Sequence, residues 1–310
     1  MGETRESTVR MTKADVRVLE QPALPWHLPG QVAWHLWQFV KRKPLGAIGA
    51  VLLCAFIGVA LLAPTLATHD PDLNNYRERI KPPSAQYWFG TDNFGRDIYS
   101  RVVYGARISI YVGLLATLLG TSLGATAGLL SGFFGGRIDQ LIQRLADIMF
   151  TIPSLVLAMV IVTMLGPSMV NVIIAIAIPR LPDTNRVIRS AVLTAKENLY
   201  IEASRAIGCA NWRIIVMHLL PNILAPYIVV ATAGLGGAIL VEASLSFLGL
   251  GVPPPAPSWG RMLSTEGMRY FETAPWMAIF PGIFISAAVF GANLFGDALR
   301  DVLDPKLRGR

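Results

Sequence analysis

The sequence has little charge for its length. Only 15% of its 310 residues are Asp, Glu, Lys or Arg, whereas 53% are hydrophobic. A soluble globular domain has about a quarter charged residues, so this composition argues against an ordinary soluble protein. The charges are also bunched, which leaves long neutral stretches between them. Both features favour an integral membrane protein.

The sequence also lacks the patterns of several catalytic and metal sites. Two cysteines, Cys54 and Cys209, do not suggest a disulfide framework. The phosphate-binding pattern GxxxxGK(S/T) is absent, and no convincing nucleophile–base set is found. The four histidines have no zinc-ligand spacing: His27, His35, His69 and His218. We therefore expect a chain that is not an enzyme and has no metal or cofactor of its own, and that depends on a separate ATPase if ATP is used.

Five neutral runs are each long enough to cross a membrane as a helix. They cover residues 45–67, 108–136, 148–179, 219–241 and 273–296, with 23, 29, 32, 23 and 24 residues. About 20 apolar residues in a helix span the hydrocarbon core. Backbone exposed to lipid must be hydrogen-bonded internally, so helices are the expected structure.

The run of 32 residues must be divided. LGPS at 165–168 is a turn signal, because Gly and Pro are adjacent. The first part, 148–165, is long enough to cross, and the second continues into a stretch that contains Arg180 and Asp183. Counting both parts gives an all-α membrane protein with six transmembrane helices.

The net charge of +7 has a plain membrane explanation. Under the positive-inside rule, the seven Lys/Arg up to Lys43 and the basic stretch 186–213 lie in the cytoplasm. Six spans then return the C-terminus to the same side. Residues 68–107 fit less well, with six Lys/Arg, but long loops obey the rule poorly. We expect membrane lipid and not nucleic acid as a partner, and no cleavable signal peptide, because the first 40 residues are polar or mixed.

The chain is expected to have five parts. They are a cytoplasmic tail (1–44), a first transmembrane helix (45–67), an extracytoplasmic loop with a short interfacial helix (68–107), a five-helix core (108–299) that contains a polar loop (189–221), and a cytoplasmic tail (300–310). Prolines argue against one continuous helix in the first tail: Pro22, Pro25 and Pro29.

Small residues recur at every fourth position of the second expected helix: Ala116, Gly120, Gly124, Gly128 and Gly132. Residues four apart lie on nearly one helix face, and small side chains there let another helix approach closely. This ridge can be a contact with another subunit or tight packing within the chain. We favour packing within the chain, because a multi-span protein has more internal than external contacts.

The polar stretch YIEASRAIGCANWRIIVMHLLPN (200–222) interrupts the apolar runs. Glu202, Arg205 and Arg213 keep it out of the hydrocarbon, Gly208 is typical of a turn, and Pro221 can begin the next helix. We expect two short helices joined at Gly208. These helices can transmit force from a cytoplasmic partner, or they can form a solvated loop that has no partner. The residues alone leave both interpretations open.

Here a family resemblance carries the argument. EAS at 202–204, Gly208 and HLLP at 218–221 closely resemble the EAA loop of ABC importer permeases. FGTDNFGRDIYSRVVYGARISI (89–110), EASLSFLGLGVPPPAPSWGRML (242–263) and the tail DALRDVLDPKLRG resemble the dipeptide/oligopeptide/nickel permease family. The resemblance covers nearly all of residues 40–309. Ser204 departs from the motif, which has a second Ala there.

The resemblance implies the type I ABC importer permease fold and a bacterial or archaeal inner-membrane location. It also implies partners: a second homologous permease subunit, two cytoplasmic ATPases that bind ATP and Mg²⁺, and an extracytoplasmic substrate-binding protein. Residues 202–221 would couple to the ATPase, and the implied coupling residues are Glu202, Ala203, Ser204, Arg205, Ala206, Ile207 and Gly208. Di- or oligopeptide is the default substrate; nickel, opines, glutathione and sugars stay open.

Two features carry charge inside or near the expected spans. Arg180 and Asp183, spaced by three, share a helix face. They can line the pathway and meet a charged substrate, or pair structurally near the inner interface, and we favour the structural pair. For Glu242, near the outer end of its helix, we favour packing or capping over substrate contact.

Two other classes of function compete with this one. An ion-gradient-driven secondary transporter would suit helices broken by Gly and Pro, but neither an inverted repeat nor a proton relay is found. A membrane-bound structural or assembly protein would not need the coupling motif. ATPase activity that appears only with the co-purified neighbouring subunits would separate the importer from both.

Overall fold

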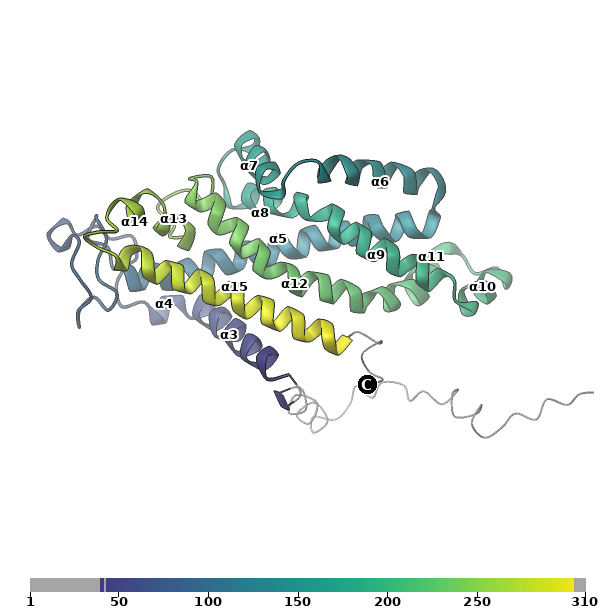
Figure 1. The fold of residues 1–310 in the computed structure, drawn as a ribbon, viewed down its shortest axis with the longest axis horizontal. Helices are drawn as coiled ribbons and strands as arrows, with labels where there is room; N and C mark the ends of the chain where they lie inside the picture. Colours follow the sequence, from purple (N-terminus) through teal and green to yellow (C-terminus); the bar gives the residue numbers. More distant parts are fainter. Residues whose placement is uncertain (1–39, 42, 304–310) are drawn as a thin grey trace, which may run out of the picture. The chain divides into compact units, whose positions relative to one another are not determined.

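The computed structural model describes residues 40–41 and 43–303, apart from the side chains of residues 265 and 266. The expectations for the first tail and its prolines, and for the last residues, 304–310, lie outside these residues. Within the described part, residues 43–303 form one compact unit of helices, with a single isolated bridge between Thr91 and Asp97 (Figure 1). The expected all-α fold is confirmed.

The central helix is α5 (Ile98–Phe134), with 37 residues. Asp97 caps its start by accepting a hydrogen bond from the Ser100 backbone N–H at 3.0 Å. The short interfacial helix expected within residues 68–107 is not separate from the second transmembrane helix, because no proline interrupts the helical run from Ile98 to Phe134. Helices α3 (Pro44–Leu61), α9 (Leu181–Lys196) and α12 (Leu220–Phe247) all pack against α5.

The other elements are shorter or lie outside this centre. They are α4 (Ala63–Leu66), η1 (Tyr76–Glu78), α6 (Gly136–Phe150), α7 (Ser154–Leu165), α8 (Met169–Ala177), η2 (Ile178–Arg180), α10 (Leu199–Ala206), α11 (Asn211–Ile214), the π-helical segment η3 (Ile215–Leu219), α13 (Trp259–Leu263), α14 (Thr265–Arg269) and α15 (Trp276–Leu303).

Four helical segments of the described chain are long and apolar enough to cross a membrane: α3, α5, Asn211–Phe247 and α15. The expected span over residues 148–165 is wrong as a single straight helix. Helix α6 ends at Phe150, and α7 begins only after Pro153, at a bend of 93°. Proline lacks an N–H and disfavours a helical residue before it, so the helix breaks there. Together α6 and α7 count as a fifth, bent span; the sixth, over residues 169–196, stays a prediction.

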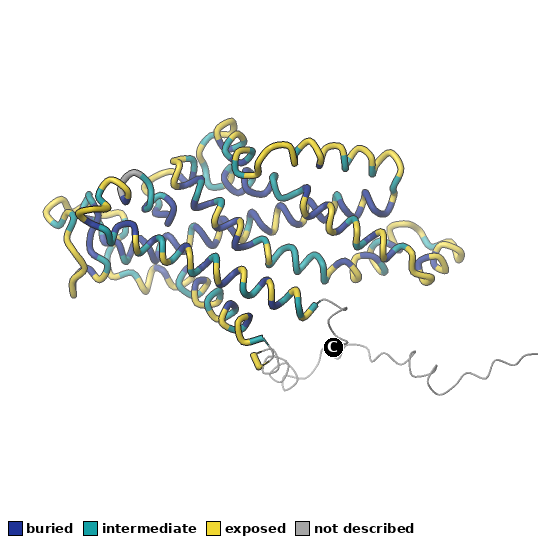
Figure 2. Tube along the Cα trace, in the orientation of Figure 1, coloured by how far each residue is buried: buried dark blue, intermediate teal, exposed yellow. Residues whose placement is uncertain are grey.

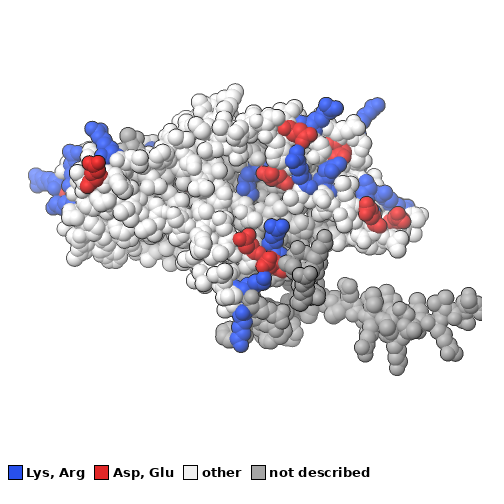
Figure 3. Space-filling view, viewed as in Figure 1, with Lys and Arg blue, Asp and Glu red and all other residues white. Residues whose placement is uncertain are grey.

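Charges gather at the two ends of the helices (Figure 3). One end, which we call the α10 end, holds α10, parts of α6 and α9, and the end of α15 beside the start of α3, where Lys43 pairs with Asp301. The other, the α13 end, holds α13, α14 and the loop of residues 67–97 (Figure 1). The surface between them is largely uncharged in this view, as a hydrocarbon belt requires. Figure 2 shows that α5 is mostly buried and that α10 is mostly exposed.

The small-residue ridge of α5 packs against the chain's own α8 and α9. A Cβ built on Gly120 would lie 2.6 Å from the Ala177 carbonyl oxygen, and one on Gly128 would lie 2.6 Å from that of Asn185. Contacts this short leave no room for a side chain. The favoured interpretation, tight packing within the chain, is confirmed.

We predict that Gly128→Ala destabilises the protein by about 1–3 kcal/mol, because the methyl group overpacks the contact with α9. Gly58→Ala is the matched control, since its Cβ would meet no atom within 4 Å. Thermal unfolding of the detergent-solubilised protein measures both. A normal unfolding temperature for Gly128→Ala would contradict the proposed close contact.

Candidate coupling site

Helix α10 is seated on the bundle by buried apolar side chains. Ile201 of α10, Ile214 of α11 and Leu219 of η3 are all fully buried. They share one cluster with Ile188 and Val192 of α9. The polar stretch is therefore folded against the transmembrane helices and is not a free loop.

Four polar side chains tie α10 to the base of α12. The Ser204 hydroxyl donates to the Tyr200 carbonyl at 2.7 Å and lies 3.4 Å from the His218 Nε2. The Asn222 amide donates to the Tyr200 hydroxyl at 3.0 Å and to the His218 carbonyl at 2.5 Å. The Tyr200 and His218 rings are 5.9 Å apart. Sequence reasoning missed this cluster; its one signal is that both Tyr200–Ser204 and His218–Asn222 are spaced by four.

The end of α10 has the two hydrogen bonds of a Schellman motif. The Cys209 N–H donates to the Ser204 carbonyl, and the Gly208 N–H donates to the Arg205 carbonyl, both at 3.0 Å. Gly208 takes a φ of +79° in the left-handed region, where a Cβ is costly. The expected turn at Gly208 is present. Glycine is favoured there by the backbone conformation and not by lack of space, because a Cβ would meet no atom within 4 Å.

Six of the seven expected coupling residues lie on the exposed face of this turn and one is buried. Ser204 faces inward at 8% exposure, where its hydroxyl lies between the Tyr200 carbonyl and the His218 ring. Ile207 is 80% exposed, as is Leu199 at the start of α10. The Arg205 guanidinium lies over the Phe133 ring at 5.7 Å. The exposed members are Glu202, Ala203, Arg205, Ala206, Ile207 and Gly208.

The connection from α11 to α12 is continuous. Helical structure runs from Asn211 to Phe247, with the π-helical turn η3 inside it. Pro221 lies in the first turn of α12, but it does not start a separate helix, because η3 leads into it without a break. A π-helical turn inside a helix is frequently found at functional sites.

Arg180 and Asp183 are not joined by a hydrogen bond or a close ion pair in the described part of the chain, where Asp183 is exposed. Their charges still attract each other, so the structural pair stays a prediction. Arg180 instead donates to the Gly234 carbonyl of α12 at 2.9 Å. The physical reason is that η2, over residues 178–180, directs the guanidinium toward α12, away from the exposed face of α9.

Glycines of α12 make the space for Arg180. A Cβ on Gly234 would lie 1.5 Å from a guanidinium nitrogen of Arg180, and one on Gly237 would lie 4.0 Å away. Any side chain at position 234 would therefore overlap with the Arg180 guanidinium. Arg180 links the break between α8 and α9 to the middle of α12.

Glu242 is a fully buried carboxyl group on α12. It accepts hydrogen bonds from the hydroxyls of Ser109 on α5 and Ser246 on α12, both at 2.7 Å. These contacts agree with the favoured packing role and join α5 to α12.

Two families match the chain. "Binding-protein-dependent transport system inner membrane component" matches residues 124–309, and "N-terminal TM domain of oligopeptide transport permease C" matches residues 29–83.

Curated relatives match over most of their length. A dipeptide transport system permease protein DppC of Alkalihalophilus pseudofirmus is 47% identical over 87% of this chain and 88% of the relative. A probable D,D-dipeptide transport system permease protein DdpC of Escherichia coli is 42% identical over 87% of this chain and 91% of the relative. A glutathione transport system permease protein GsiD of Shigella flexneri is 42% identical over 93% and 96%.

A solved structure has the same fold. The inward-facing MetNI methionine ABC transporter superposes with a TM-score of 0.55 over 67% of this chain and 98% of that chain. The sequences are 18% identical, so the likeness concerns the fold alone.

We predict that Gly234→Ala lowers stability by about 1–3 kcal/mol by displacing the Arg180 guanidinium. In an Arg180→Met background the same change is expected to cost much less, because the clash is gone. A double-mutant cycle on thermal unfolding measures this coupling. Gly237→Ala on the same helix is the control and is expected to be nearly neutral, since its Cβ would lie 4.0 Å from the guanidinium. Additive losses would show that Arg180 does not occupy the slot over Gly234.

Proposed function

The chain belongs to the family of binding-protein-dependent transport system inner membrane components, and from this premise we propose that it is the permease subunit of an ATP-driven peptide importer. One observation carries the coupling part of this proposal. Helix α10 is rigidly seated by buried residues, yet it exposes Glu202, Arg205 and Ile207 together at one end of the helices. Leu199 and Ile207, at the two ends of this polar helix, are each 80% exposed, and exposed apolar surface rimmed by polar residues is typical of a surface that a protein partner covers.

The partner proposed for α10 is a cytoplasmic ATPase. The small residues Ala203 and Ala206 allow close docking, and Glu202 and Arg205 can pair with charges on the ATPase. The continuous helix from Asn211 to Phe247 then carries movement of α10 toward the α13 end. This chain supplies the pathway and the lever, while ATP and Mg²⁺ bind to the ATPases.

The proposed assembly contains a second homologous permease subunit, two ATPases and an extracytoplasmic substrate-binding protein. Both termini and the α10 end face the cytoplasm, and the α13 end faces outward. The bent pair α6–α7 and residues 169–196 complete the six proposed spans. The basic residues near α10 support this orientation.

Peptides are the proposed substrate class. The relatives reported above are named for dipeptide, D,D-dipeptide and glutathione transport, and glutathione is itself a tripeptide. Nickel, opines and sugars have no such support here. These names also favour the importer over an ion-gradient-driven transporter.

We predict that Ile207→Ser weakens association with the ATPase subunits about tenfold, because an apolar anchor is lost from the interface. Met268→Ser on α14 is the matched control, with a side chain 65% exposed at the other end of the helices. The readouts are co-purification of the ATPases and ATP-dependent uptake of a labelled dipeptide into proteoliposomes. Uptake that follows an ion gradient without ATP would refute the proposed function.

We predict that an impermeant thiol reagent labels Ala85→Cys but not Ala206→Cys in intact cells, in a background without Cys54 and Cys209. Both alanines are exposed in the structure, so orientation alone decides the result. Labelling of both after permeabilisation is the control. Labelling at position 206 in intact cells would reverse the proposed topology.

A further inference from the structure

We propose that the loop before α5 carries a docking surface for an acidic face of the substrate-binding protein. The surface, which we call the arginine patch, consists of Leu73, Tyr76, Arg77 and Arg79. The inference rests on the proposed function and adds which surface of this chain meets that partner. The family of this chain is described as binding-protein-dependent. The patch lies at the α13 end, opposite the proposed ATPase site (Figure 1).

The patch has the composition of a protein-binding hot spot. Leu73 is 66% exposed and Tyr76 is 62% exposed. Arg77 and Arg79 are exposed, and neither is paired with a carboxylate among the residues that the structure describes. The neighbouring Lys81, by contrast, is paired with Glu78. Tyrosine and arginine are enriched among the residues that dominate binding energy, and two free cations favour an acidic partner.

The backbone of the patch is fixed at both ends. On one side, the Asn75 N–H donates to the Phe94 carbonyl at 3.0 Å. On the other, the Lys81 N–H donates to the Thr91 hydroxyl at 2.8 Å, and that hydroxyl donates to the Glu78 carbonyl at 2.5 Å. Thr91 itself is fully buried. The patch is therefore preorganised, which lowers the entropy cost of binding.

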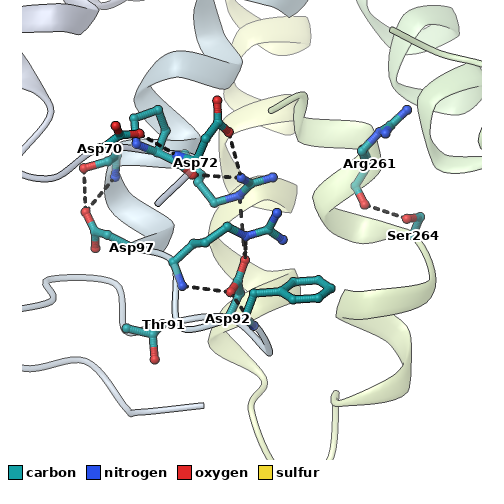
Figure 4. A network of polar contacts seen from close by, with 12 residues as sticks. Asp70, Asp72, Thr91, Asp92, Asp97, Arg261 and Ser264 are labelled. Atoms are coloured by element: carbon teal, nitrogen blue, oxygen red, sulfur yellow. Dashed lines mark hydrogen bonds and ion pairs between the residues drawn. The ribbon is translucent and has the colours of Figure 1, made fainter. Parts of the chain in front are cut away.

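A network of buried charged side chains lies on the inner side of the loop that carries the arginine patch (Figure 4). Asp92 accepts from the backbone N–H groups of Phe94 and Arg96 at 2.8 and 2.9 Å, and pairs with the Arg96 side chain at 2.6 Å. Arg101 of α5 donates to the Pro71 carbonyl at 2.9 Å. Asp92 and Arg101 are both almost fully buried, so their charges hold the loop and leave the outer arginines to a partner.

The chain turns sharply after Arg79. Ile80 has a φ of +53°, a left-handed conformation that is strained for a β-branched residue. Its N–H donates to the Asp92 carbonyl at 3.0 Å, and its side chain packs on the buried cluster of α3, α5 and α15. This turn sends Ile80 inward while Arg77 and Arg79 stay at the surface. Strain of this kind is characteristic of functional segments.

The test uses the whole complex in nanodiscs, with the substrate-binding protein of the same system loaded with a dipeptide. The measurement is the binding-protein concentration that gives half-maximal ATPase stimulation. Arg77→Glu with Arg79→Glu is expected to raise it at least tenfold and to weaken its dependence on salt. Tyr76→Ala is expected to raise it about fivefold or more. Arg77→Lys with Arg79→Lys retains most of the response, and basal ATPase activity stays unchanged.

Arg107→Glu is the matched control, because Arg107 is an exposed cation of α5 outside the patch. A wild-type concentration in the double Glu variant would overturn the patch while leaving the proposed function intact. Loss of the ATPases or of the second permease from that variant would also overturn the patch. A defect that vanishes in nanodiscs of neutral lipid would overturn it too, because it would indicate lipid binding. A wild-type complex that no binding protein stimulates would refute the proposed function and the patch with it.

Discussion

The glycines of α5 bring α8 and α9 into backbone contact with the central helix, and the remaining packing follows from that contact. Because the ridge has no side chains, the carbonyl of Ala177 lies against Gly120, and that of Asn185 lies against Gly128. At the end of the ridge, the Lys196 ammonium binds the carbonyls of Gly132 and Phe133 at 3.3 and 2.9 Å. This seats the end of α9, and α10 begins three residues later.

The two ends of the protein are built by the same strategy from different residues. At the α10 end, a cluster of isoleucine, leucine and valine side chains holds a short helix whose outer face is exposed. At the α13 end, buried Asp92, Asp97 and Arg101 hold a loop whose outer arginines are exposed. In both places a rigid base frees the outer side chains for a partner. The helical run of 37 residues from Asn211 to Phe247, about 55 Å long, links the two ends.

Contacts along that helix suggest how movement can be shared among the helices. Gly234 receives the Arg180 guanidinium, and Glu242 receives the Ser109 hydroxyl of α5. Near the first of these, a Cβ on Gly236 would lie 2.4 Å from the Asn293 side chain of α15. Helix α12 therefore meets η2, α5 and α15 through polar or backbone contacts with little free space. Interiors packed this tightly have low compressibility and transmit strain from one element to the next.

Sequence patterns were sufficient for the helical membrane class, the family, the turn at Gly208 and the internal packing of the α5 ridge. Each depends on local or periodic properties: run length, glycine conformation and a four-residue spacing. Sequence patterns did not predict the bend between α6 and α7, because a continuous apolar run does not show that the chain turns at Pro153. They also did not reveal the hydrogen bond from Arg180 to the Gly234 carbonyl, because spacing along a helix identifies neighbours on that helix only.

The sequence by itself determined that the chain is a permease of this family, and which short stretch meets the solvent at the α10 end. Tertiary structure decided which of those residues are available: Ser204 is buried against His218, whereas Ile207 is exposed. It also decided that Arg101 is buried in the loop network while Arg77 and Arg79 are exposed. The reason is physical. Burial and pairing depend on segments far apart in the chain, and composition or periodicity cannot show which of them meet.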